Sequence, residues 1–135
     1  MKTLSVLEAK RFGVFSCQAS TLVGDAANQM ADRDISCLVV VDDEGYLEGI
    51  ITRTDLMRAC VDSDCWRKLP VSDYMARGVV TVSTEDSLDT VMRLLVEKHI
   101  HRVVAVQEEE GKLWPMAVLS TADIVYHMMR TAKEC

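Results

Sequence analysis

Apolar positions change their spacing along the chain, and these changes predict helices and strands in a regular order. From Leu22 to Arg33 the apolar residues fall at i, i+3, i+4 and i+7, the stripe of an amphipathic helix. Residues 35–41 form a nearly unbroken apolar run, which is typical of a strand covered on both faces. A hairpin turn with Gly45 available for a positive φ then predicts a partner strand over residues 46–51.

The segments on either side of this block are also patterned. The chain before it predicts a short helix over residues 2–11 and a strand over 14–17, and the chain after it predicts a helix from Thr52 to about Val61. The apolar side of the first helix is expected to consist of Leu4, Leu7 and Ala9. Residues 62–70 are polar and end in a proline, so they are interpreted as a linker.

The second half of the chain repeats the first. Residues 78–82 match 13–17, and residues 100–106 match 35–41, both at an offset of 65. The amphipathic stripe returns at Leu88, Val91, Met92 and Leu95. The final helix, from about Thr121 to Ala132, is expected to bury Ile124, Val125, Met128 and Met129. Between the halves, residues 71–76 predict a short helix capped by Ser72 or Asp73.

The repeat defines the domain organisation. We expect an N-terminal helix and first repeat at residues 1–61, a linker and short helix at 62–76, and a second repeat at 77–135. The predicted fold class is α/β (α+β), with two β-α-β-β-α repeats. Because neither half carries enough apolar area to be stable alone, the repeats should pack sheet to sheet about a pseudo-twofold axis.

Charge and composition exclude several classes of protein. A net charge of −6 argues against a nucleic-acid-binding surface, which needs clustered Lys and Arg. No apolar run approaches the roughly 20 residues that span a bilayer, and Glu8 lies where a signal peptide needs apolar residues. The sequence therefore predicts a cytoplasmic protein without membrane contact. Five cysteines without CxxC spacing indicate reduced thiols, with Cys17 and Cys37 buried in strands.

The most informative motif occurs twice, at residues 49–56 and 117–124. In each copy an apolar strand runs into a hydroxyl residue, and an Asp follows three positions later at the start of a helix. Both side chains then lie beside unpaired backbone N–H groups, so they can cap the helix. The same junction can also hold a pair of sugar hydroxyls and accept a phosphate nearby. Duplication of the motif favours the second interpretation.

With the repeat laid out, the chain resembles a tandem pair of cystathionine-β-synthase (CBS) domains, a Bateman module. The resemblance covers roughly residues 13–132. It is carried by residues 49–56, by 101–106, and by 71–75 leading into 78–82. It implies an α/β pair that assembles into a disc-shaped homodimer, with clefts between the repeats that bind AMP, ADP, ATP or S-adenosylmethionine.

The resemblance also implies roles for individual residues. The ribose would be held by Thr52 and Asp55 in one copy and by Ser120 and Asp123 in the other. Adenine would lie against strand edges around Cys17, Val80 and Val82. The candidate phosphate ligands are Arg53, His101 and Arg102, although Arg53 on a first helical turn is more often a solvated surface charge.

The two copies are not equivalent. The offset places Ser36 and Cys37 where the second copy has His101 and Arg102, and Ala117 replaces Gly49. We therefore expect one strong ligand site and one that is weak or empty. No metal site is expected, because His99 and His101 share a face of the predicted strand but have no third ligand at a convincing spacing.

These observations predict a regulatory module that binds an adenosyl ligand, needs no obligatory cofactor, and signals through its dimer or an unidentified protein target. The alternative is a structural dimerisation module with vestigial clefts. Catalysis is disfavoured. No P-loop or nucleophile elbow is present, and Cys37 in an apolar strand is a poor partner for a thiol–base pair with His101.

Overall fold

The computed structural model describes residues 1–131, and these residues form two compact units. The first-repeat unit is Phe15–Val79, and the second-repeat unit combines Met1–Val14 with the chain from Val80 onward. The first-repeat unit contains β1 (Ser16–Gln18), α2 (Val23–Arg33), β2 (Cys37–Val41), β3 (Leu47–Thr52), α3 (Arg53–Asp62) and two 3-10 turns, η1 (Trp66–Lys68) and η2 (Val71–Asp73). The second-repeat unit contains α1 (Val6–Ala9), β4 (Thr81–Ser83), α4 (Leu88–Glu97), β5 (Arg102–Glu109), β6 (Lys112–Ser120) and α5 (Thr121–Thr131).

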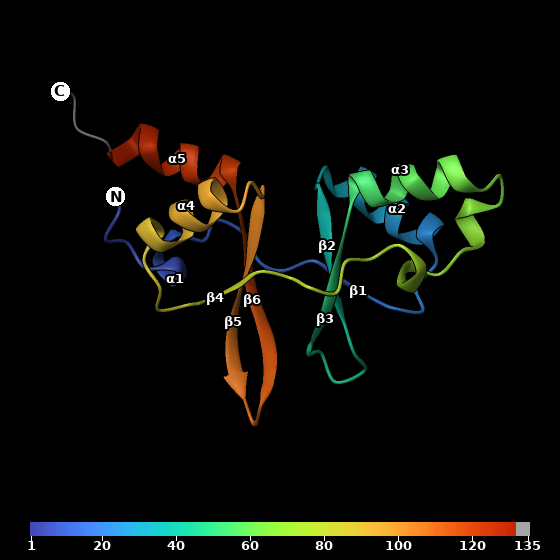
Figure 1. Cartoon of the computed structure of the whole chain (residues 1–135), viewed down its shortest axis with the longest axis horizontal. Helices are drawn as coiled ribbons and strands as arrows, with labels where there is room; N and C mark the ends of the chain where they lie inside the picture. The colour runs from blue at the N-terminus through green and yellow to red at the C-terminus, as the bar shows by residue number, and fades with distance from the viewer. Residues whose placement is uncertain (132–135) are drawn as a thin grey trace. The chain divides into compact units, whose positions relative to one another are not determined.

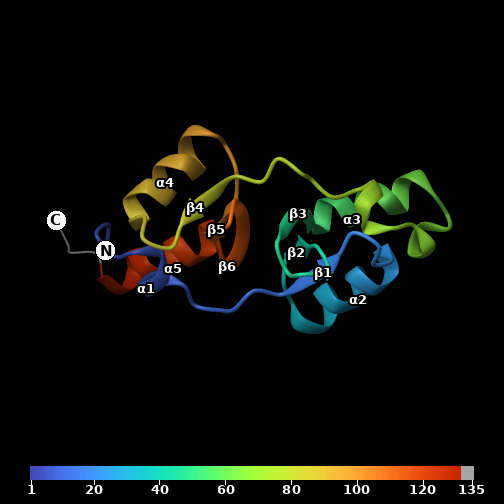
Figure 2. The same ribbon diagram turned by 90° about the horizontal axis from the view of Figure 1, so that it is seen from below.

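Each unit has one three-stranded sheet with its helices on one face (Figures 1 and 2). In the first-repeat unit β1 pairs parallel with β2, and β2 pairs antiparallel with β3. The strands β4, β5 and β6 repeat this pairing in the second-repeat unit. The predicted β-α-β-β-α order and mixed α+β class are therefore confirmed. Strands β1 and β4 each lie at an end of their sheet.

The predicted helical stripes face the sheets. The core of the first-repeat unit consists of Cys17, Ala26, Met30, Leu38, Val40, Ile51, Val71 and Met75. The core of the second-repeat unit includes Val6, Val82, Leu88, Val91, Val103, Ala105, Ala117, Leu119 and Ile124. Within residues 1–131, no helix is both long and apolar enough to cross a membrane.

The prediction for the last helix was wrong on three of the four residues expected to be buried. Ile124 is buried, but Val125 is 53% exposed and Met128 is 42% exposed. Met129, also expected to be buried, is 81% exposed. Because successive helical positions turn by about 100°, the side of α5 that holds Asp123 and Ile124 leaves Val125 and Met129 facing outward. Residue 132, the predicted end of this helix, lies outside the described residues.

Several shorter elements also differ from prediction. The helix expected over residues 2–11 is a single turn, α1, which Ser5 and Glu8 close with a capping box. Its buried residues are Val6 and Ala9, whereas Leu7, expected to be apolar core, is 48% exposed. The helix expected over 71–76 is only the turn η2, and no side chain caps it.

Each of the short turns α1 and η2 packs against the repeat that does not follow it directly in the sequence. In the second-repeat unit, the N–H groups of Val6 and Leu7 donate to the carbonyls of Asp86 and Thr84, at 2.8 and 3.0 Å. In the first-repeat unit η2 makes the same pair of bonds. The N–H groups of Val71 and Ser72 donate to Thr21 and Ala19, at 2.8 and 2.9 Å. The turn that precedes each strand-helix repeat thus packs with the body of the other repeat, which explains why residues 1–14 belong to the second-repeat unit.

Gly49 lies where two backbones approach closely. Ile50 and Ala76 exchange both of their N–H···O bonds at 2.9 Å, so the chain after η2 extends the edge of β3. A Cβ on Gly49 would lie 2.5 Å from the carbonyl oxygen of Ala76. The glycine is therefore required by packing within the first-repeat unit, and its replacement by Ala117 in the second copy reflects a different neighbour there.

We predict that Gly49→Ala destabilises the protein by about 1–3 kcal/mol, because the new methyl group must displace the Ala76 strand. The matched control is Gly78→Ala, where nothing lies within 4 Å of the added Cβ. Urea unfolding followed by circular dichroism measures both variants. Equal midpoints for the two variants would contradict the packing argument.

Candidate functional site

The first strand-to-helix junction is a closed capping box. One carboxylate oxygen of Asp55, Oδ2, accepts from the backbone N–H of Thr52 at 2.8 Å and from its hydroxyl at 3.0 Å. The Thr52 hydroxyl in turn accepts from the N–H of Asp55 at 3.4 Å. Asp55 is only 4% exposed. Burial and two hydrogen bonds from Thr52 therefore fix the carboxylate beside the first turn of α3.

The second junction repeats this geometry closely. Oδ2 of Asp123 accepts from the N–H of Ser120 at 2.8 Å and from its hydroxyl at 3.1 Å. The N–H of Asp123 donates to the Ser120 hydroxyl at 3.4 Å, and Asp123 is 7% exposed. Ser120 thus replaces Thr52 without changing the cap. In both junctions the second oxygen, Oδ1, takes no part in the capping box.

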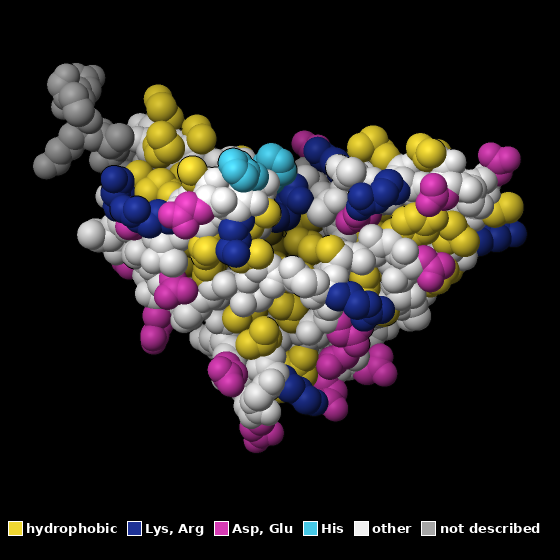
Figure 3. All heavy atoms as spheres, in the orientation of Figure 1, with side chains coloured by type: hydrophobic (Ala, Val, Ile, Leu, Met, Phe, Trp, Pro, Cys, Tyr) yellow, Lys and Arg dark blue, Asp and Glu magenta, His cyan; other side chains and the backbone are white. Residues whose placement is uncertain are grey.

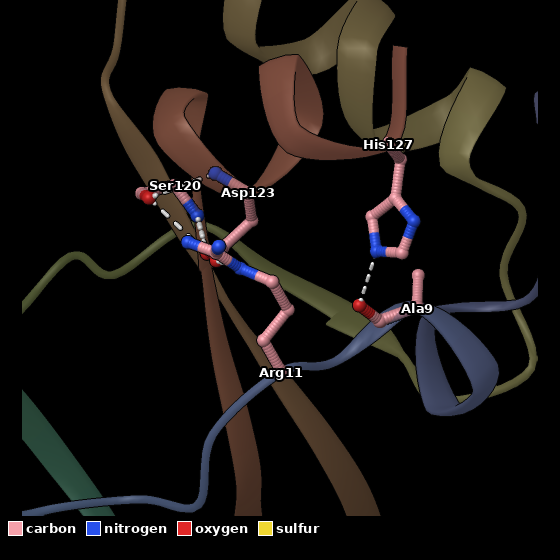
Figure 4. Close-up of polar contacts among 5 residues, drawn as sticks. All are labelled: Ala9, Arg11, Ser120, Asp123 and His127. Atoms are coloured by element: carbon pink, nitrogen blue, oxygen red, sulfur yellow. Dashed lines mark hydrogen bonds and ion pairs between the residues drawn. The ribbon is translucent and has the colours of Figure 1, made fainter. Parts of the chain in front are cut away.

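An arginine holds this second oxygen in each junction, but it comes from a different place. Arg58, one turn further along α3, donates to Oδ1 of Asp55, and its side chain is 61% exposed. Oδ1 of Asp123 accepts instead from Nε of Arg11 at 2.8 Å, and the Arg11 side chain is 26% exposed (Figure 4). The two carboxylates are therefore both paired, one locally and one across 112 positions of sequence.

The cationic candidates lie in contrasting surroundings. Arg53 pairs with Asp34 at 3.1 Å, and the side chains are 55% and 97% exposed, as expected of a surface ion pair. Arg102 lies opposite Ser120 in the β5–β6 register. Among the described residues its Nε is buried and has no hydrogen-bond partner. Leaving a buried guanidinium N–H without an acceptor costs free energy. Among these candidate cations, Arg102 is therefore the one best placed to gain from binding an anion.

The two histidines lie before β5 rather than on it. His99 has a φ of 53° at the end of α4, which is the left-handed conformation that ends many helices. The carbonyl of His101 accepts from the N–H of Thr121 at 3.0 Å and so links the start of α5 to the start of β5. The expectation that they share a strand face was wrong, because β5 starts at Arg102. Within residues 1–131, no group of three His, Cys, Asp or Glu side chains could hold a metal ion.

The residues expected near adenine lie on or beside the end strands of the two sheets. Cys17 is buried in β1 and Val82 in β4, and both side chains are part of the core. Val80 precedes β4, and its carbonyl accepts from Val104 at 3.1 Å. Burial raises the pKa of the Cys17 thiol to about 11, so this thiol is protonated at neutral pH. Cys37, predicted to be buried, is only partly buried.

Three contacts at the junctions were missed by the sequence analysis. Arg58 follows Asp55 by three positions on one helix, and that spacing was a readable signal. Tyr126 occupies the same position in the second copy, at the offset of 68 that relates Asp55 to Asp123. Its ring stacks with the Arg11 guanidinium, 4.3 Å from the centroid. Nothing local in the sequence links Arg11 to either residue.

The family model described as CBS domain matches residues 9–62 and 71–130. An uncharacterized protein of Methanocaldococcus jannaschii is 27% identical over 82% of the chain, and the match covers 25% of that protein. Across the first few curated relatives, the chain spans between 12% and 65% of their length.

Solved structures share the fold over almost the whole chain. An uncharacterized conserved protein from Pyrococcus horikoshii has a TM-score of 0.82 at 24% identity and covers 100% of this chain and 99% of its own. The CBS domain pair of protein MJ0100, solved with 5′-methylthioadenosine and S-adenosyl-L-methionine, has a TM-score of 0.82 at 20% identity, with coverage of 95% and 98%. A third structure, CBSX2 in complex with AMP, has a TM-score of 0.79 at 23% identity, with coverage of 96% and 98%.

Proposed function

The chain belongs to the CBS domain family, and from its two strand-to-helix junctions we propose that it is a regulatory module that binds an adenosyl ligand. The observation that carries the proposal is the buried carboxylate at each junction. Asp55 and Asp123 each use one oxygen to close the cap and turn the other outward to a displaceable arginine. A carboxylate oxygen held in this way is an acceptor for the 2′- and 3′-hydroxyls of a ribose.

The ligands of related structures support this class of ligand. The CBS domain pair of MJ0100 was solved with 5′-methylthioadenosine and S-adenosyl-L-methionine, and CBSX2 was solved with AMP. What these molecules share is an adenosine with a varied 5′ group. The part of the ligand that a ribose-binding carboxylate reads is therefore common to all of them, and the 5′ group is left to other residues.

Further groups suit the rest of such a ligand. The end strands β1 and β4 pair on one side only, so backbone groups near Cys17, Val80 and Val82 are available to read an adenine edge. Arg102, opposite Ser120, has a buried N–H without an acceptor and would bind a 5′ phosphate or carboxylate, with His101 beside it. We assign no anion contact to Arg53, because it already pairs with Asp34.

A regulatory role fits this chemistry better than catalysis. The Cys17 thiol has a raised pKa, which disfavours its use as a nucleophile. The carboxylates at the junctions are bound by several donors each, so neither is poised to move a proton. A ligand can act on such a module only through its different affinity for two states, and a partner or a second copy must read that difference.

We predict that calorimetric titration with AMP, ADP, ATP and S-adenosylmethionine detects micromolar binding of at least one of them. Asp55→Asn and Asp123→Asn retain an oxygen for the cap but replace the outer acceptor, so one of them should weaken binding at least tenfold. Asp34→Asn removes an exposed carboxylate and is the matched control.

Because different arginines hold the two carboxylates, we expect only one of the two Asn variants to lose most of its ligand affinity. Two equally tight ligands per chain would contradict the inequality. Absence of binding to all four compounds would overturn the proposed function and favour a structural module.

Assembly as a homodimer is the second part of the proposal, and exposed apolar side chains on two helices support it. On α3, Met57 is 59% exposed and Val61 is 85% exposed. On α5, Val125 is 53% exposed and Met129 is 81% exposed. Each pair is spaced i, i+4, and the pairs correspond at the repeat offset of 68. Hydrophobic side chains are visible over each of these helices in Figure 3. A second copy of the chain would cover both faces with matching apolar surface.

We predict that Val61→Glu and Met129→Glu shift the protein from dimer to monomer, because each buries a charge in the proposed interface. Sedimentation velocity measures the mass. The control is Val96→Glu, which places the same charge on α4 at a residue that is 72% exposed. A wild-type monomer, or dissociation caused equally by the control, would contradict this assignment.

A further inference from the structure

We propose that Arg11 is an internal occupant of the second junction, and that a ligand binding at Asp123 must displace it. This inference rests on the proposed function. It adds a regulatory contact between the N-terminal segment, residues 9–12, and the second junction. Arg11 holds Oδ1 of Asp123, which is the oxygen that the proposed function assigns to a ribose.

The N-terminal segment reaches α5 through two anchored points. Nε of Arg11 donates to Asp123 at 2.8 Å, and Nε2 of His127 donates to the carbonyl of Ala9 at 2.7 Å (Figure 4). Asp123 and His127 are spaced i, i+4 and therefore share one face of α5. The segment thus lies along the helix that starts at the junction.

Aromatic packing holds the guanidinium in place. The carbon Cζ of Arg11 lies 4.3 Å from the ring centroid of Tyr126 and 5.1 Å from that of Phe12. Arg130 stacks on the same tyrosine at 4.2 Å. A cation over an aromatic ring adds to the attraction of the carboxylate. Arg11 is therefore better positioned than Arg58, whose exposed side chain can swing away from Asp55 on its own helix.

The Arg11–Asp123 contact takes the place of a backbone contact that is found in the first-repeat unit. At the repeat offset of 65, Arg11 corresponds to Ala76, which there bridges Ile50 through backbone bonds beside Gly49. In the second copy Ala117 stands at the position of Gly49, where a Cβ would clash with such a bridge in the first-repeat unit. Among the described residues no backbone bridge joins Arg11 to Val118, and the side chain of Arg11 makes the attachment instead.

Displacement has a consequence beyond the junction. A ribose that takes Oδ1 of Asp123 removes one of the two anchors of residues 9–12, but α1 stays attached through the bonds of Val6 and Leu7. The N-terminal segment is thereby released locally, without unfolding the unit. Lys10 and Phe12 are already exposed, so occupancy at Asp123 is converted into release of the Arg11 side chain and loosening of the residues around it, a change that a partner can read.

The test uses the full chain, with adenosine and AMP as probes, because adenosine offers the ribose without a phosphate. Arg11→Ala should raise the affinity for adenosine about tenfold, since the carboxylate no longer has an internal competitor. Combining it with Asp123→Asn should abolish that gain. Arg93→Ala, which removes a 2.9 Å Nε–carboxylate pair on α4, is the matched control and should change nothing.

Hydrogen exchange read by mass spectrometry gives an independent readout. In the wild type, AMP should increase exchange in peptides covering residues 9–12, and Arg11→Ala should show that increase without ligand. Weaker binding of AMP by Arg11→Ala with unchanged adenosine binding would mean that Arg11 contacts the phosphate, and would overturn the inference. Unchanged affinity for both probes would also overturn it while leaving the proposed function intact. If neither protein bound any adenosyl compound, the proposed function itself would fail.

Discussion

The hydrogen bonds between a hydroxyl residue and an aspartate at the start of a helix organise both halves of this protein. In each junction the carboxylate satisfies the N–H of the last strand residue, while the hydroxyl satisfies an N–H of the first helical turn. The cap joins β3 to α3 in one unit and β6 to α5 in the other. Because the cap needs only one oxygen, the other can exchange its arginine for a ligand without loosening the helix. Fold and proposed function therefore depend on the same side chain.

The two junctions differ in what occupies that oxygen, and the difference arises from single positions. Arg58 and Tyr126 stand at equivalent places, so one copy supplies its own cation and the other supplies an aromatic platform for a distant one. Cys37 faces Thr52 across the hairpin, whereas Arg102 faces Ser120. Two copies with the same cap thus present different charged groups to a ligand. In this way a duplicated domain can have two sites of unequal affinity.

The repeating parts of the fold could be predicted from sequence because they depend on local spacing. The helical stripes, the hairpins and the two Asp–hydroxyl pairs all lie within a few residues of one another, and all are present. Predictions failed where distant chain segments decide the outcome. Val125 and Met128 on α5 are exposed although their spacing suggested burial, and α1 packs with residues more than seventy positions away. The Arg11–Asp123 pair spans 112 positions, so no local pattern could reveal it. The close neighbour of Gly49 is likewise a separate segment, the backbone of Ala76.

We propose above all that the capped carboxylates are the groups that bind the ribose of an adenosyl ligand. Backbone amide shifts of the nitrogen-15-labelled protein test it most directly, because the amides of Thr52, Asp55, Ser120 and Asp123 all belong to the capping boxes. On addition of AMP or S-adenosylmethionine, the account predicts that the largest shift changes occur at one of these two junctions. Saturable changes confined to other surfaces, or no changes with either compound at millimolar concentration, would contradict it.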